Sequence, residues 1–258
     1  MAKTIGLVGV GMLGRSIARL CVNAGYDVVI ANSRGPETLT DIVADLGGKA
    51  RAGTFDEACE AGDLVVLSIP MSAYKNVPVD SLAGKIVIDT LNYYPERDGQ
   101  MSEVETPDIT TGELLQRELL KSRVVKTMNN MDFIHLLGLA RPTGAADRSA
   151  MPIASDNADA KAAGVQFLDV IGYDAVDVGS LADSWRFEAG TPIYVWPYVD
   201  ERPLGMSLEE ARRSWYHKSP GVQVSTEKVK ELLDAAEKGL GIGLYGHLPF
   251  TEEALTEL

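Results

Sequence analysis

The chain has 258 residues, a length that corresponds to one large domain or two modest ones. It contains 37 acidic residues against 24 basic ones, so its formal net charge is −13. A surplus of this size argues against a general nucleic-acid binder and against a protein that a basic surface holds on an anionic membrane. It does not exclude an anionic ligand, because a local site can be positive on an acidic protein.

The two cysteines, Cys21 and Cys59, lie in apolar helical patterns and form no Cys-x-x-Cys pair. This spacing favours two buried free thiols in a reducing compartment over a disulfide framework or a cysteine-rich metal site. No apolar run approaches the roughly 20 residues of a membrane span, and the first residues lack the pattern of a signal peptide. We therefore expect a soluble cytoplasmic protein with no metal, membrane or nucleic-acid partner.

Short apolar runs alternate with amphipathic segments along the first half of the chain. Strands are predicted at residues 5–9, 27–31, 64–69 and 85–89, and helices at 12–24, at 36–46, and from a Thr54/Glu57 capping box to Gly62. Strands that are apolar on both faces and separated by helices are typical of a parallel sheet covered on both sides. The pattern predicts a doubly wound α/β fold with right-handed crossovers.

The second half is less regular. Residues 93–110 are polar and turn-rich and read as a loop, after which a Thr110/Glu113 capping box opens a helix that runs to Leu120. Strands are predicted at 123–127, 151–155 and 173–178, with a helix at 156–171. An aromatic stretch at 181–203 precedes two amphipathic helices. Ser207 and Glu210 cap the first, and the apolar face of the second holds Val229, Leu232, Leu233, Ala236 and Leu240.

A glycine-rich turn lies between the first predicted strand and the first predicted helix. Its residues match the pattern GxGxxG: Gly9, Val10, Gly11, Met12, Leu13 and Gly14. In this context Gly9 permits a tight turn, Gly11 lets a pyrophosphate approach the backbone, and Gly14 lets the helix pack closely on the strand. The N–H groups at the helix N-terminus then attract the pyrophosphate, so the sequence predicts a dinucleotide site.

The residues after the second strand indicate which dinucleotide is bound. An NAD site usually carries Asp or Glu here to hold the ribose 2′-OH, but this chain has Asn32, Ser33 and Arg34. Ser33 can donate a hydrogen bond to a phosphate, Arg34 can pair with it through its planar guanidinium, and Asn32 adds an uncharged donor. We therefore predict NADP(H). The alternative is a capping serine and a solvated arginine before the next helix.

Polar residues also follow three later strands, at the edge where open α/β sheets bind ligands. Ser68, Ile69 and Pro70 end one strand, Asn92 follows the next, and Asn129 follows the strand at 123–127. We expect these residues to flank the nicotinamide of the cofactor. They could equally be ordinary turn residues, and Asp89 could be structural or catalytic.

Support for acid–base chemistry is limited to one histidine. His135 follows a predicted cofactor-facing strand and is the best candidate for a proton donor, although an ordinary loop histidine is the competing interpretation. Without such a donor the reaction would be a bare hydride transfer between two stacked rings. The aromatic segment 185–198 could be a platform for a flat substrate or packing between domains or subunits.

The glycine motif, the segment Asn32–Glu37, Ser68–Pro70, Asp89–Tyr94 and Val124–Asn130 together resemble the F420-dependent NADP reductase family. The resemblance implies a Rossmann domain over residues 1–127 and a smaller C-terminal α/β domain with a helical tail over 128–258, for substrate binding or dimerisation. It implies pyrophosphate contacts at Gly9, Gly11, Met12 and Leu13, and 2′-phosphate contacts at Ser33 and Arg34. It also implies hydride exchange between NADP(H) and the deazaflavin coenzyme F420, and a homodimer.

Two other functions stay open. An NADPH-dependent reductase could act on another small-molecule acceptor, such as a flavin, a ferric chelate, or a small carbonyl or imine. An NADP(H)-sensing protein would bind the cofactor without turnover. The predicted strands at 151–155 and 173–178 argue against the long all-helical second domain usual in imine and hydroxyacid reductases.

Overall fold

The computed structural model describes residues 4–104 and 108–238 of the chain. The strands in this part form one sheet of eight, in the order β3-β2-β1-β4-β5-β6-β7-β8. β1 pairs in parallel with both β2 and β4, so the chain reverses its direction of growth at β1. Because the pairs from β3 to β6 are all parallel, the carboxyl ends of these strands lie at one edge. Ligand sites of open α/β sheets form at this edge, beside the point of reversal.

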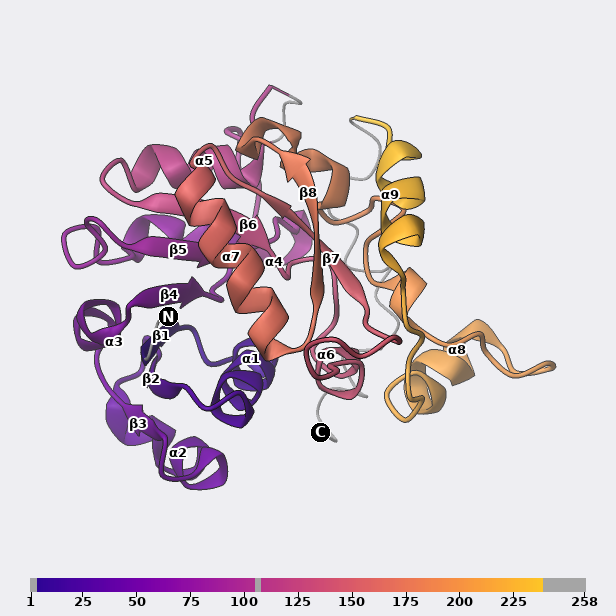
Figure 1. Ribbon diagram of the computed structural model, residues 1–258, viewed down its shortest axis with the longest axis horizontal. Coiled ribbons are helices and arrows are strands. Elements are labelled where there is room, and N and C mark those ends of the chain that lie inside the picture. Colours follow the sequence, from indigo (N-terminus) through magenta and orange to yellow (C-terminus); the bar gives the residue numbers. More distant parts are fainter. Residues whose placement is uncertain (1–3, 105–107, 239–258) are drawn as a thin grey trace.

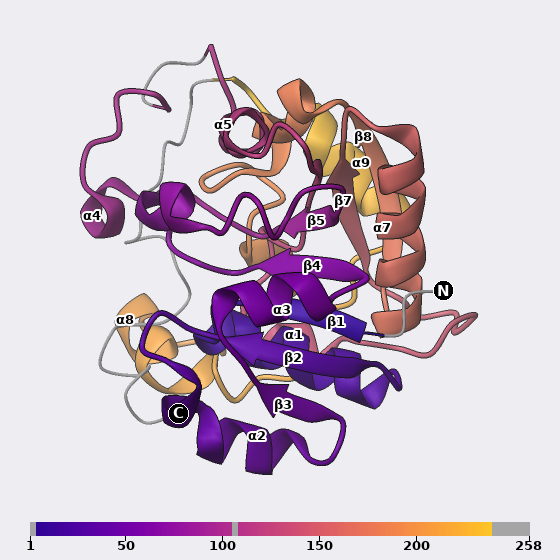
Figure 2. The same ribbon diagram turned by 90° about the vertical axis from the view of Figure 1, so that its left-hand side faces the viewer.

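The strands have the following bounds: β1 Thr4–Val8, β2 Asp27–Ala31, β3 Ala50–Ala52, β4 Leu64–Leu67, β5 Ile86–Asp89, β6 Arg123–Thr127, β7 Ala150–Ala154 and β8 Asp174–Gly179. Figure 2 shows β3, β2, β1, β4 and β5 one above another. β6 and β7 are antiparallel and pair over a short stretch, whereas β7 and β8 are parallel.

Helices cover both faces of the sheet and make three layers. α1 (Met12–Asn23) and α7 (Ala158–Ile171) contribute to one hydrophobic core, and α7 crosses one face of the sheet in Figure 1. α3 (Phe55–Ala61) and α5 (Thr111–Glu118) contribute to the other core. Neighbouring residues of β4 alternate between the two cores, as a strand that is buried on both faces requires.

The C-terminal half extends the sheet and covers its far end. β7 and β8 continue the same sheet, and α9 (Thr226–Asp234) contacts both of them. The predicted α/β character is therefore present in the described residues 128–238, and the sheet runs across the division predicted after residue 127. The remaining short helices are α2 Thr40–Leu46, α4 Pro95–Asp98, α6 His135–Gly138 and α8 Leu208–Glu210.

The predicted doubly wound α/β fold is confirmed. The observed bounds of most helices and strands agree closely with the predicted bounds. β3 was not predicted, because three residues with an exposed arginine at their centre are too short for a periodic pattern. α4 was not predicted either, since it is a single turn that begins with a proline inside the predicted loop. The helix predicted at 36–46 is a 3-10 turn followed by α2.

The predicted C-terminal helices differ in extent from the structure. Ser207 and Glu210 form the expected capping box, but α8 continues only as a π-helical turn at Ala211–Trp215. Val229 and Leu233 lie buried on α9 as predicted, whereas Leu240 lies outside the described residues.

The capping boxes of Thr54 with Glu57 and of Thr110 with Glu113 are both present. Cys21 and Cys59 are free and buried, and burial raises the pKa of Cys59 to about 12. Within residues 4–104 and 108–238, no helix is long and apolar enough to cross a membrane. The same ranges contain no group of three or more His, Cys, Asp or Glu side chains that could hold a metal ion.

A buried ion pair joins β5 and β6 below the ligand edge. Lys126 Nζ lies 3.2 Å from Asp89 Oδ2, and neither side chain is exposed. Lys126 also donates to the carbonyl of Leu91, and Asp89 Oδ1 accepts the N–H of the same residue at 2.8 Å. Asp89 therefore has a structural role, since it fixes the start of the loop that follows β5.

We expect Lys126→Met to lower the free energy of unfolding by about 3–5 kcal/mol, because it leaves the Asp89 carboxylate buried without its partner. The double variant Lys126→Met/Asp89→Asn removes both charges and should recover most of this loss. Urea denaturation of the three proteins measures the effect. A single variant as stable as the wild type would contradict the structural role of the pair.

Candidate functional site

A cavity of about 250 Å³ opens at the carboxyl edge of the sheet. It joins the N-terminus of α1 to the loops that follow β4, β5 and β6. The described residues that line it are Gly11, Met12, Leu13, Ser68, Ile69, Pro70, Thr90, Asn92, Tyr94, Arg97, Asn129, Met131, Asp132, Phe133, Tyr194 and Val195. Eight of the predicted site residues lie in this lining: Gly11, Met12, Leu13, Ser68, Ile69, Pro70, Asn92 and Asn129.

The glycines of the β1–α1 turn have the geometry that the motif predicts. Gly9 has a φ of +98°, and a Cβ there would lie 2.2 Å from the carbonyl oxygen of Ser68. A Cβ on Gly14 would lie 2.1 Å from the carbonyl oxygen of Gly9, so only glycine lets α1 approach the turn this closely. Val10 is buried in the core and is not part of the lining.

Gly11 is the N-cap of α1 and opens toward the cavity. A Cβ on this residue would meet no atom within 4 Å. The first turn of α1 contains no acidic residue, and its N–H groups have no partners inside the helix. An anion at this position would meet unpaired donors and the positive end of the helix dipole.

The turn after β2 carries the residues predicted for the 2′-phosphate. Ser33 and Arg34 are exposed, and within the described part of the chain Arg34 forms no ion pair. The side chain of Asn32 also builds the turn. Its Oδ1 accepts the N–H of Arg34 at 3.0 Å, and its Nδ2 donates to Thr38 Oγ1 at 2.9 Å. Asn32 therefore positions Arg34, and its role as a phosphate donor stays a prediction.

Two asparagines clamp the ends of β5 and β6 together. Asn92 Nδ2 donates to the carbonyl of Asn129 at 2.7 Å, and Asn129 Nδ2 donates to Asn92 Oδ1 at 3.1 Å and to the carbonyl of Phe187 at 2.9 Å. Two acceptors therefore face Asn129 Nδ2, which fixes the orientation of its amide. Among the described residues, Asn129 Oδ1 is buried without a hydrogen-bond partner. A buried acceptor beside a cavity is suited to an N–H donor of a ligand.

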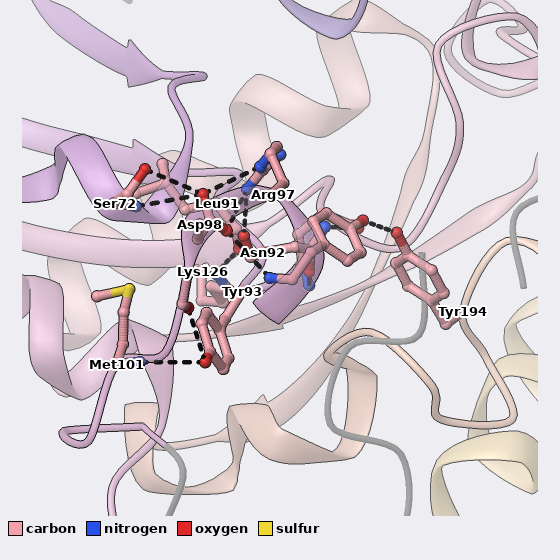
Figure 3. Close-up of polar contacts among 12 residues, drawn as sticks. Ser72, Leu91, Asn92, Tyr93, Arg97, Asp98, Met101, Lys126 and Tyr194 are labelled. Carbon is pink, nitrogen blue, oxygen red and sulfur yellow. Dashed lines mark hydrogen bonds and ion pairs between the residues drawn. The ribbon is translucent and has the colours of Figure 1, made fainter. Parts of the chain in front are cut away.

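The loop after β5 and the aromatic segment form another part of the lining. Figure 3 shows Arg97 in a network with Asp98 and Ser72, and Tyr194 with its hydroxyl directed at that of a second tyrosine, Tyr94. The Arg97 guanidinium lies 4.7 Å from the centroid of the Tyr94 ring. Burial, together with the neighbouring Tyr94, raises the pKa of Tyr194 well above its usual value, so this phenol stays protonated near neutral pH.

The aromatic segment reaches the cavity through a strained turn. Val195 has a φ of +59°, which is rare for a β-branched residue. The N–H of Trp196 donates to the carbonyl of Tyr194 at 2.7 Å, so Val195 is the centre of a γ-turn. The N–H of Val195 donates to the carbonyl of Asn130 at 2.8 Å, which ties the turn to the loop after β6. Strain of this kind is found at sites where the surrounding structure fixes the backbone.

His135 does not line the cavity, and the predicted role of proton donor is not assigned to it. Its side chain is buried, with Nδ1 at 2.7 Å from Asp132 Oδ2 and Nε2 at 3.2 Å from Ser219 Oγ. Asp132 does line the cavity, but its Oδ1 accepts the N–H groups of Ile134 and His135. His135 therefore orients Asp132 and links it to the segment around Ser219.

Several lining residues were not predicted. Thr90 lies between Asp89 and Asn92, which were both considered as site residues. Its position directly after a strand was therefore a signal that could have identified it. Tyr94 and Arg97 belong to a loop whose polar sequence shows no periodicity. Tyr194 and Val195 reach the cavity from more than 60 residues beyond β6, and no local pattern predicts this contact.

Residues 4–93 match the family model described as NADP oxidoreductase coenzyme F420-dependent. The match spans the sheet from β1 to β5 and includes the glycine turn, the Asn32–Arg34 turn and Ser68–Pro70. Rat (Rattus norvegicus) metalloreductase STEAP3 is 26% identical over 190 residues, which are 73% of this chain and 36% of the rat protein. The chain thus spans about a third of the length of that relative.

Two solved structures share the fold. A hypothetical protein of Sinorhizobium meliloti, SMa0349, aligns with a TM-score of 0.66 at 22% identity and covers 75% of this chain and 93% of its own. A candidate F420-dependent NADP reductase of Arthrobacter sp. FB24 aligns with a TM-score of 0.61 at 23% identity and covers 71% and 87%. The segment that matches the family model of coenzyme F420-dependent NADP oxidoreductases carries both the glycine turn and the turn at Asn32–Arg34.

Proposed function

We propose that the protein transfers hydride between NADP(H) and a deazaflavin of the coenzyme F420 type. The observation that carries this proposal is the single cavity that joins the N-terminus of α1 to the ends of β4, β5 and β6. A dinucleotide laid along this edge has its phosphates at one end and its reactive ring at the other. The family description supports the choice of both reactants.

The pyrophosphate would bind at the N-terminus of α1. Gly11 leaves the backbone open to a ligand, and the N–H groups of Met12, Leu13 and Gly14 have no acceptors inside the helix. The 2′-phosphate would bind at Ser33 and Arg34, on the turn that Asn32 shapes. Asn32, Ser33 and Arg34 carry no carboxylate at the position where NAD sites hold the ribose 2′-OH, which supports NADP(H) over NAD(H).

The nicotinamide would lie between Ser68–Pro70 and the asparagine clamp. Its carboxamide carries an N–H₂ group that can donate to Asn129 Oδ1, the buried acceptor without a partner. This hydrogen bond would select one face of the ring and hold it at a fixed depth. Since the amide of Asn129 is itself held by Asn92 and Phe187, the acceptor is in place before the cofactor binds.

The chemistry that the cofactor supplies is hydride donation or acceptance at the nicotinamide ring. The protein would contribute position and exclusion of water, because in the described lining the hydroxyl of Tyr194 and the carboxyl group of Asp132 are both engaged by neighbouring groups. Tyr194 has a strongly raised pKa, and Asp132 is held by His135 and two backbone N–H groups. These features favour a bare transfer between two stacked rings over carbonyl or imine reduction, which needs a proton at the same step.

A second candidate is the NADPH-driven reduction of a ferric chelate. It is supported by the similarity to rat metalloreductase STEAP3, which spans 73% of this chain. A flavin acceptor is the related alternative. Assembly as a homodimer in the cytoplasm is a further proposal that rests on the family resemblance.

We expect Arg34→Glu to raise the Kd for NADPH at least about tenfold, while the Kd for NADH stays the same or falls, because a Glu here can hold the ribose 2′-OH. The loss of a charged hydrogen bond costs about 1.5–3 kcal/mol, and the new carboxylate repels the 2′-phosphate. Isothermal titration calorimetry with both nucleotides measures the difference. Arg117→Glu on α5 is the matched control, since it makes the same charge change at another exposed arginine. Equal NADPH affinity in both variants would refute the assignment of Arg34.

Mixing the purified protein with NADPH and oxidised F420 tests the reaction itself. We expect the absorbance of both compounds to fall together, in a 1:1 ratio, because one hydride leaves NADPH for each deazaflavin reduced. A parallel assay with ferric citrate and riboflavin tests the second candidate and its alternative. Turnover with those acceptors and none with F420 would overturn the leading proposal, and tight NADPH binding without any turnover would favour a sensor.

A further inference from the structure

The loop after β5 presents one arginine to the cavity in a fixed orientation. Arg97 Nε donates to Asp98 Oδ1 at 3.0 Å, and Nη2 donates to Asp98 Oδ2 at 2.8 Å and to the carbonyl of Asn92 at 2.8 Å. Within the part of the chain that the structure describes, Nη1 has no hydrogen-bond partner. The side chain is 33% exposed, although two of its three nitrogens are anchored.

Asp98 is itself held in place by the loop. It accepts the N–H of Tyr94 at 3.0 Å and the hydroxyl of Ser72 at 3.1 Å, and its side chain is fully buried. Burial alone would raise the pKa of Asp98, but the bonds from Arg97 and Tyr94 lower it on balance, so the carboxylate stays ionised at neutral pH. The Tyr93 hydroxyl pins the same loop, since it donates to Gly99 O at 3.1 Å and accepts the N–H of Met101 at 3.2 Å (Figure 3).

This arrangement directs a fixed dipole at the cavity. Arg97 is part of the lining and Asp98 is not, so the positive end of the pair faces the ligand and the negative end lies behind it. The carboxyl group in the described lining, that of Asp132, is engaged by His135 and by backbone N–H groups. The guanidinium lies over the Tyr94 ring, so a cation–π contact also helps to hold it in place.

Hydride transfer creates the charge that such a dipole would stabilise. When NADPH gives up a hydride, with its two electrons, it becomes NADP⁺, and a neutral acceptor that receives this hydride becomes an anion. A proton from solvent neutralises that anion in a later step. Preorganised donors directed at developing charge are a large source of rate acceleration in enzymes.

We propose that Arg97 is a catalytic residue that contacts the hydride acceptor and stabilises, through Nη1, the negative charge that the acceptor gains. Asp98 is the positioning residue for the guanidinium. This assignment rests on the hydride transfer proposed above, and it places the acceptor against the part of the lining that Tyr94 and Arg97 form. It predicts that the acceptor is neutral where it receives the hydride.

Single-turnover kinetics of Arg97→Met test this role, with saturating NADPH and either F420 or its core deazaflavin without the phosphate-bearing tail. We expect the rate of hydride transfer to fall about 100-fold with both acceptors, with little change in the Kd for NADPH. Arg97→Lys keeps the charge but not the bidentate geometry, so its rate should lie between the two. Arg97→Met/Asp98→Asn keeps the loop free of an unpaired buried carboxylate and should be as slow as Arg97→Met.

Arg186→Met is the matched control. Arg186 lies 4.5 Å over the ring of Trp185 but is not part of the lining, so its removal should leave the rate unchanged. A wild-type rate in Arg97→Met would overturn the role of Arg97 and leave the proposed function standing. A loss confined to F420 would also overturn it, because Arg97 would then bind the tail. A wild-type protein that reduces neither acceptor would overturn the proposed function and this role together.

Discussion

The close approach of α1 to the turn after β1 is the constraint on which the rest of the site depends. A Cβ on Gly14 would lie 2.1 Å from the carbonyl oxygen of Gly9, and a Cβ on Gly9 would lie 2.2 Å from that of Ser68. Because both residues are glycines, the helix N-terminus, the end of β1 and the end of β4 come together with no glycine side chain between them. The cavity begins at the N-terminus of α1 and extends toward the ends of β5 and β6.

The net charge of −13 does not conflict with an anionic ligand at this place. Attraction would come from local devices, namely the unpaired N–H groups of α1, the exposed Arg34 and the guanidinium of Arg97 held by Asp98. Each of these groups would act on the ligand at short range. The carboxylates elsewhere on the surface are distant and are screened by salt, so they have little influence on the electrostatics of the site. The absence of a carboxylate on the turn at Asn32–Arg34 bears on cofactor choice far more than the total charge does.

Much of the fold could be predicted from the sequence, because local patterns determine it. The apolar strands, the two capping boxes and the glycine turn all depend on residues within a few positions of one another. The two short elements β3 and α4 lacked a periodic pattern. The wall of the site that holds Arg97, Tyr94 and Tyr194 could not be predicted, since it is built by contacts across about a hundred residues of sequence. His135 shows the reverse case: its position after β6 suggested catalysis, but its partners Asp132 and Ser219 hold it behind the cavity.

A crystal structure with bound NADP⁺ tests the central claim most directly. We predict pyrophosphate oxygens at about 3 Å from the N–H groups of Met12 or Leu13, the 2′-phosphate at Arg34, and the carboxamide nitrogen within hydrogen-bond distance of Asn129 Oδ1. The nicotinamide would then leave the Arg97 side of the cavity open for the acceptor. A dinucleotide bound elsewhere, or bound here with its 2′-phosphate away from Arg34 and its carboxamide away from Asn129, would contradict the account.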